Sequence, residues 1–265
     1  MVSELRQLDD LRALRDLLAG IWGRPEEAPL SLETLKALAH SGSYVAGARA
    51  GDRLVGGLVG WLGGSPSPGL HLHSHILGVA ADSQVRGLGF ELKQHQRGWC
   101  LERGIEVVEW TTDPLVRRNA YFNLGKLGAH APEYLVNFYG VMADSLNAGE
   151  ESDRLLISWR LDSPQAVAAA DGRAAEPDID SLLHDGAEFI LSVGPSGEPV
   201  SRASNARVLL CEVPEDIVEL RHSRPMSARS WRLAVRRALG DAFEAGYQIT
   251  TATRTGHYIL ERPVQ

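Results

Sequence analysis

The chain has 265 residues, of which 44% are hydrophobic and 23% are charged, and its 27 Gly and 13 Pro are spread along the sequence. This composition is typical of a globular protein with a buried core, and it excludes collagen-like, mucin-like and coiled-coil classes. The formal net charge is -7 and the acidic excess lies in both halves, so we expect no nucleic-acid partner.

Two further features bear on location. The only cysteines are Cys100 and Cys211, which excludes a disulfide framework and favours a reducing, cytoplasmic location. Charged side chains interrupt the first twenty residues and argue against a signal peptide. The uncharged stretch 54–81 contains prolines and many glycines, so we interpret it as buried strands and expect no membrane partner.

The first part of the chain alternates strand and helix patterns. Asp9 and Asp10 are expected to cap the first helix and Ser31 the second, because short polar side chains accept hydrogen bonds from the free amides of a helix start. Period-two apolar runs that end at glycine-rich turns predict strands. The expected elements are a strand at 2–8, helices at 9–22 and 31–41, strands at 44–50, 54–61 and 70–80, a helix at 90–104, a strand at 105–112, a helix at 115–128 and a strand at 155–161.

The second part begins where the composition changes to Ala, Asp, Pro and Gly. Residues 163–180 are therefore expected to link a first domain, 1–162, to a C-terminal α/β subdomain, 181–265. The elements expected there are strands at 188–193 and 207–213, helices at 215–222 and 228–245, and strands at 248–253 and 258–261. Arg229, Arg232 and Arg236 share one face of the long helix, and we expect that face to be solvated.

The most informative segment joins the strand at 70–80 to the next helix and reads Gln84-Val-Arg86-Gly87-Leu-Gly89. The first amides of a helix have no internal partners, and the helix dipole adds partial positive charge there. Glycines let the backbone approach an anion closely, and Arg86 can add a charge-assisted contact. Taken alone, the Gly-x-Gly turn fits a tight packing turn equally well.

With its surroundings, this segment resembles the acyl-CoA loop of the GNAT superfamily of N-acyltransferases, Gln/Arg-x-x-Gly-x-Gly/Ala. The order of elements over about residues 1–162 and the later Lys126-Leu127-Gly128 extend the resemblance. It implies an α/β GNAT fold, with a mixed central sheet, a splayed strand pair and helices on both faces, plus a smaller α/β C-terminal subdomain. The chain also resembles bacterial two-part GNAT proteins linked to N-acylamino-acid metabolism, through Leu72-His-Ser-His75 and Asn137-Phe-Tyr-Gly140.

The resemblance implies acyl-CoA, either acetyl-CoA or succinyl-CoA, as co-substrate, and no metal. The pantetheine arm is expected at the end of the strand before the loop, and the pyrophosphate on the backbone amides of the loop. The expected cofactor-binding residues are Leu77, Gly78, Val79, Val85, Arg86, Gly87, Leu88, Gly89, Phe90 and Asn119.

The later helix departs from the family. The usual Asn and Tyr of that helix fall on Arg117 and Leu124, and the family's Tyr often protonates the leaving thiolate. Candidate replacements are tyrosines that otherwise fit the core as amphipathic side chains. They are Tyr121, Tyr134 and Tyr139. We choose Tyr139, because it lies in a polar-aromatic segment just beyond the helix.

His71, His73 and His75 alternate along one strand and project from one face. They fit structural histidines, a metal site or a proton relay. The relay is similar to that of aralkylamine N-acetyltransferases of this superfamily, with His73 and His75 at the matching positions, and an imidazole suits a general base near neutral pH. Glu109 on the neighbouring strand is a rival base.

These patterns predict transfer of an acyl group to the primary amine of a small molecule, with an amino acid as one option, by direct attack in a ternary complex. Arg117 and Arg118 are candidates for binding a carboxylate of the acceptor or acyl group. For each of these arginines, and for Asp113, Asp153 and Arg154, a surface ion pair without a functional role is the expected alternative. Because the family's Tyr is missing, a non-catalytic acyl-CoA-binding module or sensor is the alternative function. The sequence does not determine the oligomeric state, and a homodimer is one option.

Overall fold

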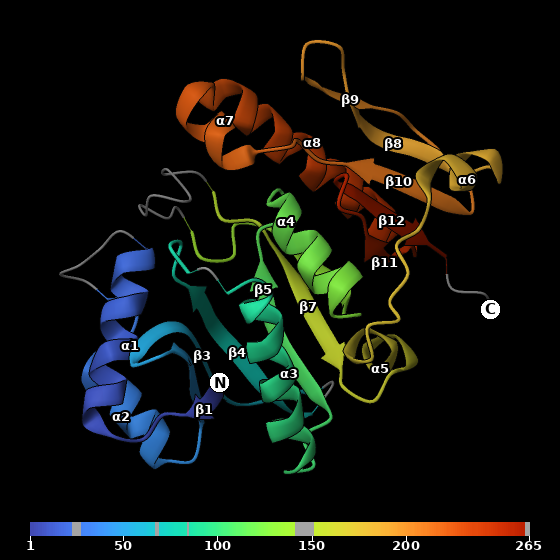
Figure 1. The fold of residues 1–265 in the computed structure, drawn as a ribbon. Coiled ribbons are helices and arrows are strands. Elements are labelled where there is room, and N and C mark those ends of the chain that lie inside the picture. The colour runs from blue at the N-terminus through green and yellow to red at the C-terminus, as the bar shows by residue number, and fades with distance from the viewer. Residues whose placement is uncertain (23–27, 67–68, 84, 141–150, 263–265) are drawn as a thin grey trace. The chain divides into compact units, whose positions relative to one another are not determined.

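A computed structural model describes residues 1–22, 28–66, 69–83, 85–140 and 151–262 (Figure 1). The chain divides into two compact units, Met1–Trp110 and Thr111–Gln265. None of the described helices is long and apolar enough to cross a membrane. The predicted mixed α/β class with an additional C-terminal α/β region is confirmed.

The first unit is built on a mixed sheet. Its neighbouring strands are β1 (Val2–Glu4), β2 (Tyr44–Ala50), β3 (Arg53–Gly64), β4 (Leu70–Val79) and β5 (Val107–Thr112), whose last two residues belong to the second unit. The pairs β1–β2, β2–β3 and β3–β4 are antiparallel, and the pair β4–β5 is parallel. Strands were predicted at all five places in the chain, and the hairpin of β2 and β3 was predicted too, but β1 ends at Glu4 rather than at residue 8.

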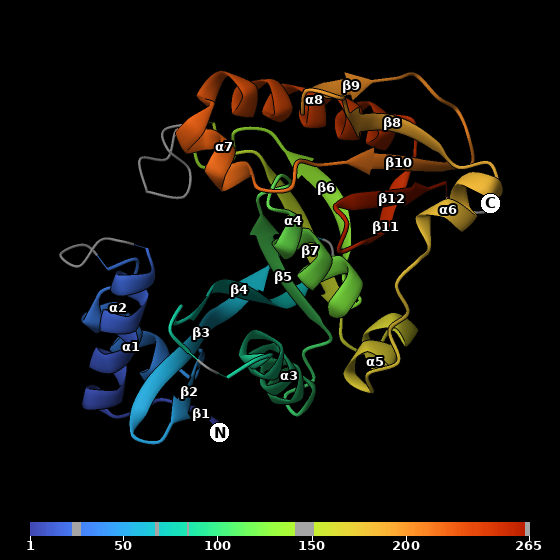
Figure 2. The same ribbon diagram turned by 45° about the horizontal axis from the view of Figure 1, so that its top comes forward.

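Helices cover both faces of this sheet (Figure 2). They are α1 (Leu8–Ile21), α2 (Leu32–His40) and α3 (Leu88–Leu101). Glycines in β3 permit close contact: a Cβ on Gly57 would lie 2.1 Å from Leu14 of α1, whereas one on Gly56 would lie 3.1 Å from Leu88 and Leu92 of α3. Neighbouring strand residues face opposite sides, so α1 and α3 lie on opposite faces.

The helix starts differ from the prediction in one respect. Ser31 caps α2 as expected, since its hydroxyl accepts a hydrogen bond from the Thr34 amide at 3.2 Å. The prediction that Asp9 and Asp10 cap α1 is wrong, because the helix begins at Leu8 and both aspartates lie in its first turn. They act there as acceptors in ion pairs, with Asp9 bonded to Arg12 at 2.7 Å.

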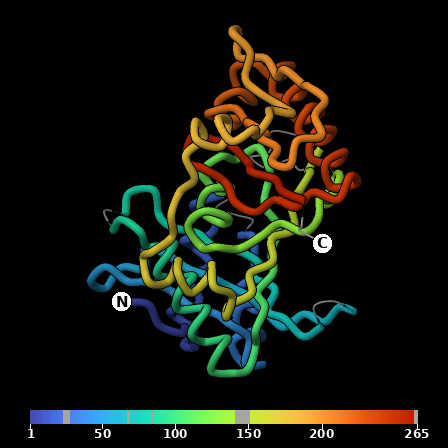
Figure 3. Tube along the Cα trace, turned by 90° about the vertical axis from the view of Figure 1, so that its right-hand side faces the viewer, coloured from blue at the N-terminus to red at the C-terminus, as the bar shows by residue number. Residues whose placement is uncertain are grey.

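The remaining strands of the sheet belong to the second unit. In spatial order its strands are β7 (Arg154–Arg160), β6 (His130–Leu135), β11 (Gln248–Ala252), β12 (His257–Glu261), β10 (Val208–Glu212), β8 (Glu188–Val193) and β9 (Pro199–Ser201). Only the β8–β10 pair is parallel among these. The pairing of β11 with β6 brings the C-terminal strands beside residues 130–135 (Figure 3).

The helices of this unit include a long one that precedes the last two strands of the chain. They are α4 (Arg117–Ala120), which continues into a π-helix over Tyr121–Lys126, α5 (Pro164–Ala170), α6 (Ile179–His184), α7 (Ile217–Ser223) and α8 (Pro225–Glu244). The stretch expected as a linker, 163–180, contains α5, which is capped by Ser163 and buries Ala166 and Ala169. Small alanines give no strong apolar periodicity, which explains why this helix was not predicted. The domain boundaries themselves stay a prediction.

Candidate functional site

Strands β4 and β5 of the first unit are paired over only part of their length. Their parallel register holds at Leu72–Val108 and His73–Glu109, and β4 continues to Val79 in pairing with β3. The β5-facing backbone of residues 74–79 therefore has no strand partner among the described residues of this unit. A backbone edge of this kind can pair with an extended, amide-containing ligand. Leu77, Gly78 and Val79 lie on it.

The start of α3 offers a cradle for an anion. Gly87, the residue before the helix, has a φ of +80°, and a Cβ there would meet nothing within 4 Å. The amides of Leu88 and Gly89 donate to no described group, whereas the Phe90 amide donates to the Gly87 carbonyl at 2.9 Å. Arg86 and Val85 are exposed beside them. Gln84, the remaining motif residue, lies outside the described residues.

Three aromatic rings cluster on one face of β3 and β4. The ring centroid of Trp61 lies 5.2 Å from that of His73 and 4.5 Å from that of His75, and the two imidazoles are 5.8 Å apart. A register shift between Val59 and Gly60 leaves His75 as an extra residue in β4. The two histidines chosen from the sequence are therefore brought together.

His71 and Glu109 form a second pair in this unit. The His71 Nε2 lies 3.6 Å from the Glu109 Oε2, and its Nδ1 lies 2.9 Å from the Gly69 carbonyl oxygen. The side chains are only 10% and 13% exposed. A Cβ on Gly63 would lie 2.6 Å from the His71 Nε2, so glycine makes room for the ring. His71 was not among the predicted catalytic residues, although its alternation with His73 in the sequence was an available signal.

Burial sets the protonation state of the histidines. It lowers the pKa of His73 to about 4, with the neighbouring charges of His75, His71 and Lys93 acting in the same direction. Burial also lowers the pKa of His75. Both rings are therefore neutral at pH 7 and can accept a proton, but His73 is a weaker base than a free imidazole.

Lys93 of α3 lies behind the same strand. Its Nζ donates to the Ser74 hydroxyl at 2.9 Å and to the Gln96 side-chain oxygen at 3.0 Å, and lies 3.5 Å from the ring centroid of Trp110. Its complete burial lowers the pKa of Lys93 well below its usual range. Nothing in its sequence context predicted this, because a lysine in an amphipathic helix usually faces solvent.

Tyr139 lies in a tightly held turn of the second unit. Its amide donates to the Ser152 hydroxyl at 2.8 Å, and its own hydroxyl lies 3.0 Å from the Thr111 hydroxyl. Asn137 has a φ of +47°, and its backbone N–H donates to the Asp153 carboxylate at 3.0 Å. The Tyr139 ring is about half exposed, so its hydroxyl can reach a ligand.

Residues 11–126 match the sequence model of the acetyltransferase (GNAT) family. This segment is a GNAT domain. Solved structures similar to the chain include aminoglycoside 6'-acetyltransferase type Ii, at 20% identity and a TM-score of 0.48, covering 62% of this chain and 98% of that one. A GNAT-family acetyltransferase from Streptococcus pneumoniae has 12% identity, a TM-score of 0.49 and coverages of 60% and 97%. The ribosomal-protein-S18-alanine N-acetyltransferase from Escherichia coli has 18% identity, a TM-score of 0.45 and coverages of 60% and 92%. No curated protein matches the sequence significantly.

The GNAT match confirms the predicted superfamily, whose members transfer acyl groups from acyl-CoA. The departures within the later helix are visible in the structure. Leu124, at the position of the family's usual Tyr, is buried in the π-helix. Of the candidate replacements, Tyr134 donates its hydroxyl to Asp153 at 2.7 Å, and burial raises its pKa well above the usual range. Tyr121 is partly covered by the guanidinium of Arg254, 5.0 Å from the ring centroid.

The two arginines expected to bind a carboxylate differ. The Arg117 Nε donates to the Arg254 carbonyl at 2.5 Å, and its Cδ would lie 2.9 Å from a Cβ on Gly256, so its side chain is packed within the second unit. Arg118 and Asn119 are exposed. Only Arg118 of this pair therefore remains available to a ligand.

The prediction of surface ion pairs at Asp113 and Asp153 is wrong, because both carboxylates are buried. The prediction of a solvated arginine face is wrong for Arg232 and Arg236 but holds for Arg229, which is exposed. Arg232 is 3% exposed and donates to both oxygens of Asp113 at 2.9 Å, and Arg221 donates to the same carboxylate at 2.6 Å. Burial alone would raise the pKa of Asp113, but the arginine charges outweigh it and the pKa is lowered. Long-range contacts of this kind leave no local pattern in a sequence.

Asp153 and Arg154 are buried as well. Arg236 donates to the Asp153 carboxylate through its Nε at 2.9 Å and its Nη2 at 2.7 Å. The Arg154 Nη1 donates to the Asp153 carbonyl at 2.8 Å. In the part of the chain that the structure describes, no three His, Cys, Asp or Glu side chains gather as a metal-binding group.

Proposed function

We propose that this chain transfers an acyl group from acyl-CoA to the primary amine of a small molecule. One observation carries the proposal. The same unit contains both the unpaired edge of β4 and the start of α3, where two backbone amides have no hydrogen-bond acceptor among the described residues. In it, the pantetheine arm would lie along Leu77, Gly78 and Val79. The pyrophosphate would lie on the free amides of Leu88 and Gly89.

Acyl-CoA, as acetyl-CoA or succinyl-CoA, supplies the thioester. In the proposed reaction the free amine forms its bond to the thioester carbon and the bond from carbon to sulfur breaks. The attacking nitrogen then loses a second proton, which restores the proton that the acid gives to the thiolate. The chain's residues must first remove a proton from the ammonium form of the acceptor. His73 and His75 are neutral at pH 7, and Glu109 lies beside His71, so these side chains can pass that proton toward solvent.

The proton that neutralises the leaving thiolate needs a separate donor. Tyr139 is proposed for this role, since its hydroxyl is partly exposed and already paired with the Thr111 hydroxyl at 3.0 Å. Tyr134 is a poorer candidate, because its hydroxyl is engaged by Asp153. Arg118 is the side chain proposed to bind a carboxylate on an amino-acid acceptor.

A cytoplasmic location is part of the same proposal, because Cys100 and Cys211 are both buried free thiols. The homodimer stays a prediction.

The test is release of free CoA thiol from acetyl-CoA and succinyl-CoA, with amino acids and aralkylamines offered as acceptors. Turnover with at least one amine, lost when that amine is replaced by its N-acetyl derivative, supports the proposal. Binding of CoA without turnover on any amine would instead favour the sensor, which the burial of Leu124 at the usual Tyr position makes the second candidate.

A further inference from the structure

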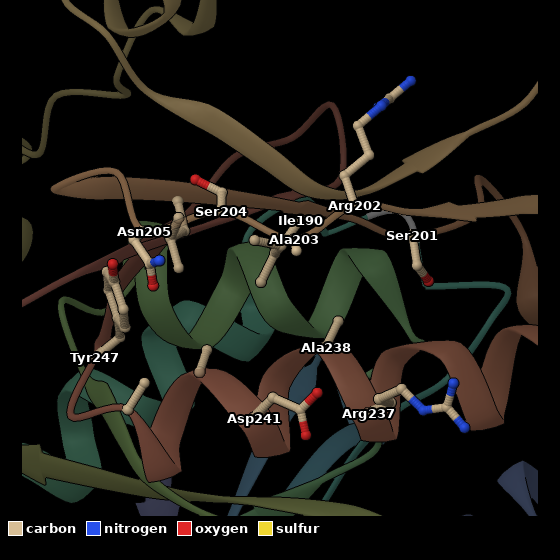
Figure 4. A pocket seen from close by; sticks show the side chains of 13 residues that line it. Ile190, Ser201, Arg202, Ala203, Ser204, Asn205, Arg237, Ala238, Asp241 and Tyr247 are labelled. Atoms are coloured by element: carbon tan, nitrogen blue, oxygen red, sulfur yellow. The ribbon is translucent and has the colours of Figure 1, made fainter.

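A pocket of about 390 Å³ lies in the second unit, outside the segment matched to the GNAT family. One wall is the segment 201–206, and the opposite wall is α8 (Figure 4). Its volume falls in the range of about 300–1,000 Å³ that is usual for small-molecule sites. None of the residues discussed for acyl transfer lines it.

The floor of the pocket is formed by buried side chains that are mainly apolar. Ile190, Leu209 and Tyr247 are almost fully buried beneath it. Ala238 and Ala242 line the helix side with methyl groups, which leaves the volume open. Figure 4 shows Tyr247 beside Asn205 at one end, where side chains of the two walls meet.

The segment 201–206 is fixed in place by polar contacts. The Arg202 guanidinium donates to the Ser192 hydroxyl at 2.9 Å, and the Ser204 hydroxyl donates to Glu188 at 2.6 Å. At the far end, the Tyr247 hydroxyl donates to the Ala206 carbonyl at 2.7 Å. The wall is thus held before any ligand arrives, which lowers the entropy cost of binding.

Two opposite charges stand at the mouth of the pocket. Arg237 and Asp241 are one helical turn apart on α8, and both are exposed pocket-lining residues. Neither side chain makes a hydrogen bond or ion pair with any residue that the structure describes, whereas the Asp241 backbone carbonyl accepts a hydrogen bond from the Ala245 amide at 3.0 Å. Arg232 and Arg236 on the same helix are both bound to carboxylates. A guanidinium and a carboxylate are therefore left for a ligand.

We propose that this pocket binds a small zwitterion, an α-amino acid with an apolar side chain. Asp241 would accept hydrogen bonds from the ammonium group, and Arg237 would donate to the carboxylate. The side chain would enter between the alanines of α8 and the ring of Tyr247. A purely anionic ligand would face the Asp241 carboxylate, and a purely cationic one would face Arg237, so each fits less well than a molecule that carries both charges.

The test titrates the full chain, without acyl-CoA, with L-leucine and L-phenylalanine and follows the Tm and backbone amide NMR shifts. N-acetyl-L-leucine lacks the ammonium charge, and L-leucinamide lacks the carboxylate. We expect at least one of the two amino acids to bind with a Kd of about 10 mM or below. Amide shifts should map to residues 201–206 and α8, and both derivatives should bind more weakly. No binding by either amino acid, or equal binding by the derivatives, overturns the proposal.

Variants assign the binding to this pocket. Arg237→Gln and Asp241→Asn should each raise the Kd roughly tenfold, because each removes one charged partner. Arg229→Gln and Glu244→Gln are the matched controls, since both lie exposed on α8 outside the pocket lining and should leave the Kd unchanged. Ala238→Leu should block binding by filling the pocket while both charges remain. Amino-acid binding that survives all three pocket variants would place the ligand elsewhere, such as the acyl-transfer site, and would overturn the proposal.

Discussion

His73 and His75 lie against the ring of Trp61, and burial holds both in the neutral form. A low pKa also makes His73 a weak base. With a pKa of about 4, His73 can take a proton from an ammonium group only if it passes that proton on at once. In the proposed reaction, we therefore expect the His71–Glu109 pair to accept the proton that His73 cannot retain.

The first prediction concerns pH. The basic form of His73 is present above a pH of about 4 and is lost below it, because its pKa is lowered in the folded protein. The acid limb of kcat/KM should therefore show no break near pH 6.5 from this residue. The His73→Phe/His75→Phe variant should lower kcat/KM by about a hundredfold or more at pH values below the acceptor's own pKa. A break near pH 6.5 in the unmodified protein, or equal losses at every pH in the variant, would contradict the assignment.

The second prediction concerns the thiolate. Tyr139→Phe removes only the hydroxyl that pairs with Thr111, so kcat should fall by about tenfold to a hundredfold while the Kd for acyl-CoA is unchanged. Tyr134→Phe is the control for loss of a tyrosine hydroxyl from the same region, and it should lower the free energy of unfolding because Asp153 loses a donor. Large loss of kcat in Tyr121→Phe, with Tyr139→Phe unaffected, would move the acid to the π-helix.

At the scale of elements, the start of α3 combines a left-handed glycine with free amides. A β-branched residue at a φ of +80° costs about 1–2 kcal/mol, so Gly87→Val should distort the loop and raise the Kd for CoA roughly tenfold. Gly98→Val lies in the same helix at an ordinary φ, with nothing within 4 Å of its Cβ, and serves as the matched control. Equilibrium titration with CoA measures both. Equal affinity in the two variants would remove the loop from the proposed site.

The same elements show what the sequence could predict. The strand at 70–79, the glycine turn and α3 carry local signals, because turns and helix starts depend on residues close in the chain. Strand β6, with Pro132 and polar neighbours, carries no such signal. A helix was predicted over 115–128, but no local signal indicated that residues 121–126 would be π-helical. The approach of His71 to Glu109 depends on the register of β4 against β5, and the burial of Lys93 depends on what packs over α3, and neither is encoded within a local window.

Helix α8 contacts a segment that lies much earlier in the chain, since Arg236 and Asp153 are 83 positions apart. Arg236 holds Asp153, and Asp153 in turn accepts the amide of Asn137 at 3.0 Å, two residues before Tyr139. Because Asp153 has no exposed surface, loss of its charged partner leaves a buried carboxylate without its main compensation. The C-terminal region therefore has a structural role in shaping the turn that carries the proposed acid.

The last prediction follows from this connection. Arg236→Gln should lower the free energy of unfolding by about 1–3 kcal/mol. It should also lower kcat, as Tyr139→Phe does, because the turn at 137–140 loses the contact that holds Asp153 in place. The Kd for CoA should stay unchanged, since the loop at 85–90 has no part in these contacts. Arg236→Lys keeps the charge and should recover part of kcat, whereas Arg229→Gln on the same helix should behave like the unmodified protein. The measurements are urea unfolding, CoA titration and thiol release on the same preparations. If Arg236→Gln loses stability while kcat and its pH profile are unaffected, α8 supports the fold alone and Tyr139 does not depend on it.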